Sequence, residues 1–366
     1  MTKEEMIRIA QDSARVCYSE KEFHEIETER DNPDLINLLK TIGHLSPFEH
    51  PTLTLGMKGI PKALAMVFNN EKDYVTSEKS ARYTVMKDVE PLQKEKYNKW
   101  IEMLHPVIDK AYPSMSDQKK REMNIGKLCQ ENARYMTSVF TPTQMKHSIN
   151  FRQLNFLIYE FEGFVSEYLG KKSEPFKARL AESMQEFLKQ TSQFRVEGLK
   201  NQSDRHLSFF SKRKFEEHFG DVYSTTYDGS FAQLAQAHRH RTISYNVLDG
   251  DTLGAPLGVF VPDVLPEDMK EMWVSDLMEI SKYDFSQAQL IRINERGRIE
   301  DFRSKTILRL DGPAQYEIMK QTKKTAEKYS KFKTEVSDWI KPKCAQNMIC
   351  ASPCVWGPKK ALERIV

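Results

Sequence analysis

The sequence predicts a fold of mixed helices and strands, arranged as two domains. The chain has 366 residues, of which 29% are charged and 39% hydrophobic, a balance typical of soluble globular proteins. At roughly 100–200 residues per domain, this length favours two domains. A polar stretch without apolar periodicity, 191–207, divides the chain near its middle. On both sides of it a strand, a break and a helix follow one another.

The first half alternates strand and helix patterns. The run 46–50 predicts a turn or a short helix, and Thr52–Leu55 alternates like a half-buried strand. Ala63–Phe68 is then typical of a helix. Apolar residues recur at helical spacing over 154–165 and again over 180–188, which predicts two core helices.

The second half repeats this order. Tyr223–Tyr227 is rich in residues that favour strands, and a helical run, Phe231–His238, follows it. Apolar residues at helical spacing predict another helix over 269–280. Pro313 opens a long helix that we expect to continue toward Trp339.

Charge and composition exclude several classes of protein. Lys plus Arg exceeds Asp plus Glu by only 55 − 52 = 3, too little to predict nucleic-acid binding from bulk electrostatics. No window approaches the roughly 18 apolar residues that span a bilayer, and the chain opens without a charged-then-apolar leader. Five cysteines at these spacings predict neither a disulfide framework nor a metal site. We therefore expect a cytoplasmic protein with reduced thiols and no membrane segment.

A dense group of polar residues lies in the run 236–246. Gln236, Arg239 and His240 fall at i, i+3 and i+4, so a helix would place them on one face, which Ser244 would extend. Arginine stays ionised and presents fork-shaped donors matched to phosphate, so this face predicts an anion site. A solvated basic patch is the alternative, because four consecutive basic residues are a weak pattern.

The same run resembles part of the signature of the flavin-dependent thymidylate synthases. In that family the signature reads Arg-His-Arg, two residues, Ser, one residue, Asn, two residues, Ser, one residue, Arg. Arg239–Arg241, Ser244 and Asn246 match its first part. The last two positions fall on Asp249 and Asp251, whose charges would repel the phosphate that the family's Ser and Arg hold.

The first half of the chain resembles the remaining part of that signature. The run 46–50, the strand after it and the helix from Ala63 are similar to the segment that precedes the signature in the family. Asn70–Lys72 then stands where Arg-His-Arg belongs, whereas Glu78–Tyr83 matches the Glu-x-Ser-x-Arg-Tyr end of the signature. The two halves have therefore lost opposite parts of one motif.

Motifs further along the family's sequence show the same complementarity. In the first half, Ala133–Arg134 and Asn150–Arg152 match the family's Ala-Arg and Asn-x-Arg. The family's last arginine, however, falls there on Glu160 or Phe161.

The second half keeps the arginine that the first half lacks. Ala288–Gln289 replaces Ala-Arg and no Asn-x-Arg is visible, yet Arg309 stands five residues before Ala314–Glu317, as in the family. The resemblance covers most of residues 10–320. We interpret the chain as a duplicated synthase domain whose copies have complementary losses.

The resemblance implies an α+β fold of two tandem, diverged copies, each a mostly antiparallel sheet with helices, that together form a pseudo-dimer. The copies would span 1–190 and 208–340, with a linker at 191–207 and a C-terminal tail at 341–366. Family members are homotetramers with active sites between subunits, so two of these chains would form a homodimer. Each chain would then need only one composite site. The alternative is that both copies have decayed into a scaffold.

The family's reaction moves a methylene group from methylenetetrahydrofolate to C5 of deoxyuridylate, and a hydride from FAD, reduced by NADPH, completes the methyl group. The resemblance therefore implies a thymidylate synthase that binds FAD and a pyrimidine deoxynucleotide and needs no cysteine nucleophile. One alternative is a flavin and folate enzyme with another acceptor or product, such as a hydroxymethylated pyrimidine nucleotide. The other is a noncatalytic descendant that binds nucleotides or nucleic acid.

The resemblance also implies a role for each matched residue. Arg309 would face the pyrimidine and stabilise negative charge that develops on the base, because its high pKa prevents it from acting as an ordinary base. The nucleotide would be held by Glu78, Ser80, Arg82, Arg134, Gln236 and Arg239. The flavin would be held by Asn150, Arg152, Arg239, His240 and Arg241.

Overall fold

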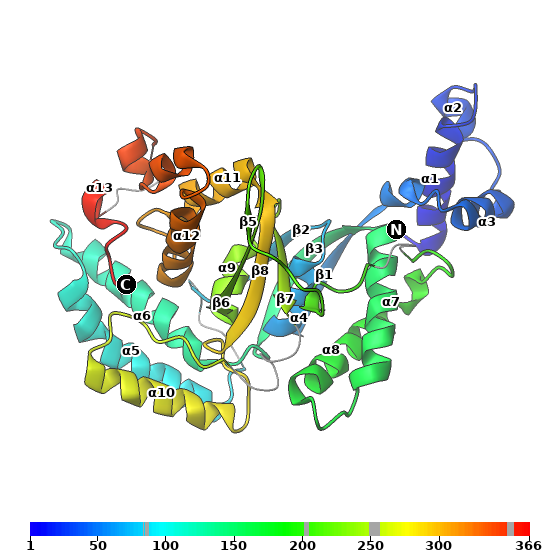
Figure 1. The fold of residues 1–366 in the computed structure, drawn as a ribbon. Helices are drawn as coiled ribbons and strands as arrows, with labels where there is room; N and C mark the ends of the chain where they lie inside the picture. Colours follow the sequence, from blue (N-terminus) through cyan, green and yellow to red (C-terminus); the bar gives the residue numbers. More distant parts are fainter. Residues whose placement is uncertain (83, 85–87, 201–204, 249–256, 350–354) are drawn as a thin grey trace. The chain divides into compact units, whose positions relative to one another are not determined.

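A computed structural model describes residues 1–82, 84, 88–200, 205–248, 257–349 and 355–366 of the chain. It has the expected α+β fold, with strands and many helices (Figure 1). The chain forms two compact units: unit 1 comprises 1–79 and 143–207, and unit 2 comprises 80–142 and 208–366. Tyr83, Asp249 and Asp251, which enter the motif comparison, lie outside the described residues.

Unit 1 is built from helices and a small sheet whose strand order is β1-β3-β2. Its helices are α1 (Lys3–Val16), α2 (Phe23–Ile26), α3 (Pro33–Ile42), η1 (Ser46–Glu49), α4 (Lys62–Asn70), α7 (Phe151–Tyr168), α8 (Pro175–Thr191) and η3 (Ser192–Phe194). Its strands are β1 (Thr52–Pro61), β2 (Val75–Glu78) and β3 (Pro142–Asn150), the last of which begins at the boundary between the units.

Unit 2 contains a sheet of order β4-β7-β8-β6-β5, antiparallel except where β4 pairs with β7. Its strands are β4 (Phe209–Ser211), β5 (His218–Phe219), β6 (Val222–Ser230), β7 (Ser244–Leu248) and β8 (Leu290–Arg298). Its helices are α5 (Pro91–Ala111), α6 (Gln118–Ala133), η2 (Arg134–Met136), α9 (Phe231–Ala237), α10 (Glu267–Ser281), α11 (Ile299–Arg309), α12 (Tyr316–Tyr329), η4 (Thr334–Trp339), η5 (Lys343–Gln346) and α13 (Gly357–Lys360).

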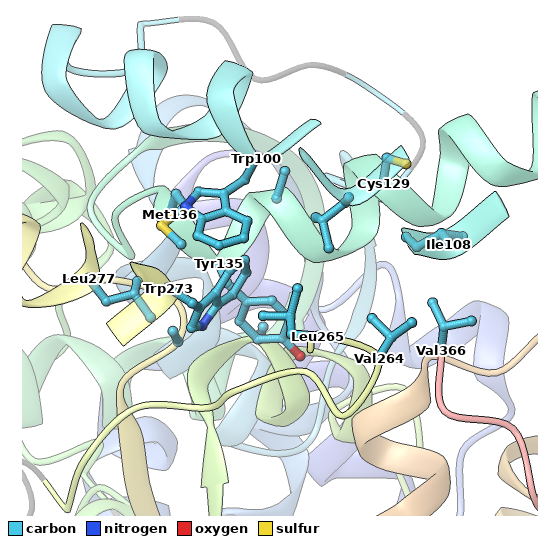
Figure 2. Packing of buried hydrophobic residues seen from close by; sticks show 14 of the residues in the cluster. Trp100, Ile108, Cys129, Tyr135, Met136, Val264, Leu265, Trp273, Leu277 and Val366 are labelled. Carbon is cyan, nitrogen blue, oxygen red and sulfur yellow. The ribbon is translucent and has the colours of Figure 1, made fainter. Parts of the chain in front are cut away.

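The units do not follow the order of the chain, because residues 80–142 pack with 208–366. Apolar packing holds these two segments together. The rings of Trp100 on α5 and Trp273 on α10 meet edge to face at 4.8 Å, and both are fully buried beside Tyr135 (Figure 2). The copy boundaries at 1–190 and 208–340 thus remain a proposal about repeated sequence, and the compact units cross them.

Both units contain the same three-strand arrangement. The order β1-β3-β2 in unit 1 corresponds to β6-β8-β7 in unit 2, and a helix follows the central strand in each. Val75 pairs with Ser148 in unit 1, and the corresponding Ser244 pairs with Arg296 in unit 2. By the same register, Phe161 on α7 is equivalent to Arg309 on α11.

This register corrects one motif assignment. Counted back from the central strands, Ala133–Arg134 corresponds to Ser281–Lys282, so the expected match at Ala288–Gln289 is wrong. A reciprocal contact supports the count: Ser138 and Ser286, which correspond to one another, form an antiparallel bridge. On either side of it, Val139 N donates to Phe285 O and Gln287 N donates to Thr137 O, both at 2.9 Å.

Several elements differ from their sequence predictions. The long helix expected from Pro313 toward Trp339 ends at Tyr329, and a separate 3₁₀ turn, η4, follows it. Helices α5 and α6 have no counterpart among the predictions, although Trp100, Leu104 and Ile108 recur at helical spacing along α5. The strands expected at Thr52–Leu55 and Tyr223–Tyr227, and the helices expected at 154–165, 180–188 and 269–280, are confirmed.

The described part of the expected linker packs onto unit 1. Val196 and Leu199 are buried in the core that α1 and α3 form. Further along, the Arg205 guanidinium donates to Gln153 Oε1 at 2.9 Å and to Lys72 O at 2.7 Å. Residues 191–200 and 205–207 therefore contribute contacts to this unit.

Unit 1 also buries a histidine that has no polar partner. His147 on β3 is fully buried, stacks on Tyr74 at 5.1 Å and meets Phe68 at 5.3 Å. Neither ring nitrogen finds a hydrogen-bond partner among the described residues. Burial lowers the pKa of His147 to about 4, so the ring stays neutral in the folded state.

We predict that His147→Phe reduces the sensitivity of unit 1 to acid. The unfolded chain protonates this histidine below about pH 6.5, whereas the folded protein resists protonation until about pH 4, so the histidine makes stability fall as the pH falls. The loss between pH 7 and pH 5 should be about 2 kcal/mol larger in the parent protein than in the variant. Urea denaturation at both pH values measures it; His24→Phe, at an exposed position, is the control and should behave as the parent.

Candidate functional site

The basic run does not form one helical face. Helix α9 (Phe231–Ala237) is capped by Ser230, whose hydroxyl accepts from Gln233 N at 3.0 Å. Because β7 starts at Ser244, the chain must turn in between. Arg239 and Arg241 are exposed on that turn, whereas His240 points inward and is buried. The prediction of a shared face that extends to Ser244 is therefore wrong.

Arg309 at the end of α11 is bound to this inward side. Its Nε donates to His240 Nε2 at 2.7 Å, and its Nη2 donates to Gln236 O at 2.9 Å. Burial, followed by the charges of Arg309, Lys305 and Arg239, lowers the pKa of His240 to about 2. The imidazole is therefore neutral and serves as an acceptor. Burial and the nearby charge of Arg239 lower the pKa of Arg309 to about 10, so this residue remains a cation at neutral pH.

Arg82 comes from the first half of the chain and reaches one residue of the second half. Its Nε donates to the Glu131 carboxylate in a buried ion pair. Its Nη2 donates at 3.1 Å to the carbonyl of Pro313, four residues beyond Arg309. Ser80 lies at the start of the same turn, where its hydroxyl accepts from Arg82 N at 3.4 Å. All of these residues belong to unit 2.

Arg134 is the least satisfied member of the group. Arg134 is only 4% exposed, yet its Nε and Nη2 find no acceptor among the described residues. Burial lowers its pKa, and the charge of Arg82 lowers it further, while Tyr135, Glu131 and Glu317 act in the opposite direction. A buried guanidinium with unused donors is an incomplete anion site, because each unmade hydrogen bond costs free energy.

These side chains form what we call the arginine cluster, which consists of Arg82, Arg134, Arg239 and Arg309. Gln236, which is 4% exposed and whose Oε1 has no described hydrogen-bond partner, lies beside it. Apart from the exposed Arg239, these side chains are buried, so they offer several N–H donors and one open amide acceptor in a setting shielded from water. Such a set suits a ligand that carries both an anionic group and a neutral ring with an N–H donor.

Three of the expected site residues lie in unit 1 instead and have partners there. Glu78 accepts from Lys62 Nζ at 2.5 Å, and the Asn150 side chain caps α7 by accepting from Gln153 N at 2.8 Å. Arg152 Nη1 donates to the Glu49 carboxylate at 2.6 Å. The unit 2 cluster is therefore formed without them.

Sequence reasoning missed two residues that support the cluster. Glu131 binds Arg82 and stands one helical turn before Arg134, a spacing that could have drawn attention to it. Tyr135 follows Arg134 directly, and its hydroxyl donates to Glu317 Oε2 at 2.6 Å. No pattern in the sequence indicates this second contact, because 182 positions separate its partners.

The described residues show no further kind of site. No described helix is long and apolar enough to cross a membrane. Within the same residues, no three His, Cys, Asp or Glu side chains gather as a metal would require. Cys129 is buried, and burial raises the pKa of its thiol to about 12.

One protein family matches part of the chain. Residues 2–159 match the family model described as thymidylate synthase complementing protein. No protein of curated function is similar enough in sequence to match.

Solved structures give distant matches. A flavin-dependent thymidylate synthase from Helicobacter pylori, complexed with FAD and dUMP, is 20% identical over 53% of this chain and 95% of that chain, with a TM-score of 0.30. A UMP/dUMP methylase, PolB, from Streptomyces cacaoi is 17% identical over 42% of this chain and 72% of that chain, with a TM-score of 0.27.

We predict opposite effects on stability when two arginines of the cluster are replaced by methionine. Arg134→Met removes a buried charge with unused donors, so it should raise the free energy of unfolding by about 1–3 kcal/mol. Arg82→Met removes the partner of Glu131 and leaves a buried carboxylate alone, so it should lower that free energy by about 3 kcal/mol. Urea denaturation without ligand measures both. Equal destabilisation by the two variants would show that Arg134 is already satisfied.

Proposed function

We propose that this chain, whose residues 2–159 match the family model described as thymidylate synthase complementing protein, transfers a one-carbon unit from methylenetetrahydrofolate to C5 of deoxyuridylate with the help of bound FAD. The main support is the arginine cluster in unit 2, which joins residues from both halves of the chain. A duplicated chain with one composite site needs only one copy of each part of the motif, so complementary losses in the two halves are expected.

In this proposal Arg134 and Arg82 bind the nucleotide phosphate. A dianionic phosphate accepts the Nε and Nη2 donors that Arg134 leaves unused among the described residues. Arg82 is already fixed by Glu131 and the Pro313 carbonyl, so it adds positive charge at little cost in side-chain entropy. Ser80, at the start of the same turn, offers a hydroxyl. Binding therefore removes the burial penalty of Arg134.

Gln236 and Arg309 would bind the pyrimidine. The open Gln236 Oε1 can accept the N3–H of uracil, which cytosine does not carry. Arg309 has given one N–H to His240 and one to Gln236 O, and its guanidinium retains further donors. Because the neutral His240 holds Arg309 without cancelling its charge, Arg309 can stabilise negative charge on the ring as C5 reacts.

The turn after α9 fits a flavin dinucleotide through its exposed side. Arg239 and Arg241 are exposed and make no ion pair with a described residue, so both are available to a pyrophosphate. Bound FAD would supply the hydride after reduction by NADPH. Asn150 and Arg152 belong to the proposed flavin site by resemblance only, and each would have to exchange its present partner. Glu78 is likewise assigned to the nucleotide by resemblance only, and it would have to release Lys62.

The residues of unit 1 support the proposal of one site per chain. The positions of unit 1 that are equivalent to His240 and Arg309 of unit 2 carry other residues. Glu71 stands where unit 2 has His240, and the fully buried Phe161 stands where it has Arg309. Arg205 lies over this region, with its Nη2 4.0 Å from Glu71 Oε2 and its guanidinium 4.0 Å from the ring centroid of Phe156. The chain itself therefore fills the equivalent place in unit 1. We further propose that two chains form a homodimer, as the family's assembly implies.

The function is tested by the spectrum and products of the purified protein. We expect a flavin absorbance that NADPH bleaches, and a product heavier than deoxyuridylate by one methylene unit when methylenetetrahydrofolate is present. A mass that corresponds to a hydroxymethyl group would select the altered-product alternative. A colourless protein that binds deoxyuridylate but cannot be reconstituted with FAD would contradict the enzyme and leave a binding protein.

We predict that Arg82→Ala and Arg309→Ala each lower kcat/KM by at least about a hundredfold, since each removes a charge-assisted donor from the site. The two residues come from different halves, so the pair tests whether the site is shared. Arg292→Ala is the control, because Arg292 forms a half-exposed ion pair with Asp228 in the same unit and should keep full activity. Full activity in either cluster variant would refute a composite site.

A further inference from the structure

A buried carboxylate ties together the two segments that carry the proposed nucleotide-binding residues. Glu317 lies in the first turn of α12, and three donors converge on it. Its Oε1 accepts from Ser230 N at 2.8 Å, and its Oε2 accepts from Ser230 Oγ and from Tyr135 OH, both at 2.6 Å. The Tyr135 hydroxyl in turn accepts from Gln315 Nε2 at 2.7 Å.

Each donor stands at a point that sets the position of a site residue. Ser230 caps the start of α9, and the last turn of this short helix carries Gln236. Tyr135 is the neighbour of Arg134 in η2, and its ring is held in the core beside Trp273 (Figure 2). Glu317 therefore connects the start of the Gln236 helix to the Arg134 segment, which belongs to the other half of the sequence.

The ionised carboxylate is the group that this connection requires. A carboxylate has two acceptor oxygens, whereas an amide has one and would point N–H groups at further donors. Burial raises the pKa of Glu317, while the bonds from Ser230 and Tyr135 and the charge of Arg134 act to lower it. Hydrogen bonds in such a buried setting are strong and leave little freedom of movement.

We propose that Glu317, acting through Tyr135 and Ser230, is a positioning residue that fixes the spacing between Arg134 and Gln236 and thereby sets the affinity for the nucleotide. This inference depends on the proposed function. Glu317 does not touch the ligand in this assignment. Loosening the link should therefore weaken binding much more than it slows the chemical step.

A second buried carboxylate in unit 2 provides a matched control. Glu295 on β8 accepts from Tyr223 OH at 2.6 Å and from Lys305 Nζ at 2.6 Å. Tyr223 and Tyr135 are 0% and 1% exposed, so a Phe in place of either tyrosine removes the same kind of buried bond. Only the Tyr135 bond adjoins a residue assigned to the nucleotide.

The test compares Tyr135→Phe with Tyr223→Phe in the flavin-loaded chain. Both should lower the melting temperature by similar amounts. Only Tyr135→Phe should raise the Kd for deoxyuridylate, by about tenfold, and raise KM in parallel while kcat stays within about threefold. Glu317→Gln should raise Kd and KM by a larger factor while kcat again changes little. In the double variant, Tyr135→Phe should raise the Kd by a smaller factor than it does in the parent protein.

Each outcome has a distinct meaning. If the two tyrosine variants bind deoxyuridylate equally well, Glu317 is only structural and the inference is refuted while the proposed function stands. If kcat falls and Kd does not change, a positioning role in binding is likewise refuted. If the parent protein itself fails to bind deoxyuridylate, the proposed function fails, and the inference fails with it. Should Glu317→Gln not fold, the tyrosine pair still decides.

Discussion

The chemistry of unit 2 depends on how guanidinium groups are held once they have left water. Arg309 is bound by two neutral acceptors, the His240 ring and the Gln236 carbonyl. A carboxylate in their place would cancel its charge and reduce its value to an anionic ligand, whereas neutral acceptors fix the side chain and leave the charge in effect. Arg82 takes the opposite solution with Glu131, and Arg134 retains unused donors. The three side chains are thus fixed in different ways, and the proposed function assigns all three to the nucleotide.

Sheet topology explains how such distant residues meet. In both units the last strand of the three-strand motif, β3 or β8, lies between the first two. The helix that follows this strand, α7 or α11, therefore begins at a fixed place relative to the turn after the short helix, α4 or α9. Arg309 reaches His240 in this way. Because residues 80–142 belong to unit 2, Arg82 and Arg134 join the same neighbourhood. The reciprocal bonds around Ser138 and Ser286 are what two diverged copies of one segment would form.

The sequence predicted local elements better than the arrangement of the site. Strands β1 and β6 and the core helices follow from apolar spacing, because burial of one face is a local property. The prediction of one helical face over 236–244 was wrong because only six residues separate α9 from β7, and the chain must turn within them. Membership of residues 80–142 in unit 2 depends on the contact between Trp100 and Trp273, which no window of sequence contains. The contact between Tyr135 and Glu317 escaped notice for the same reason. Resemblance alone connected Arg309 to the site.

The equivalent positions of unit 1 carry neutral or apolar side chains where unit 2 carries buried charges. Unit 2 buries the ion pair of Glu295 and Lys305, whereas the register places His147 and Leu157 at those positions in unit 1. Phe161 likewise replaces Arg309. Replacing buried charges by apolar or neutral groups of similar volume is often neutral or stabilising, so nothing in folding itself requires these charges. Unit 1 carries none of these charges at the equivalent positions, and the burial penalty of Arg134 in unit 2 fits the proposal that a ligand completes the cluster.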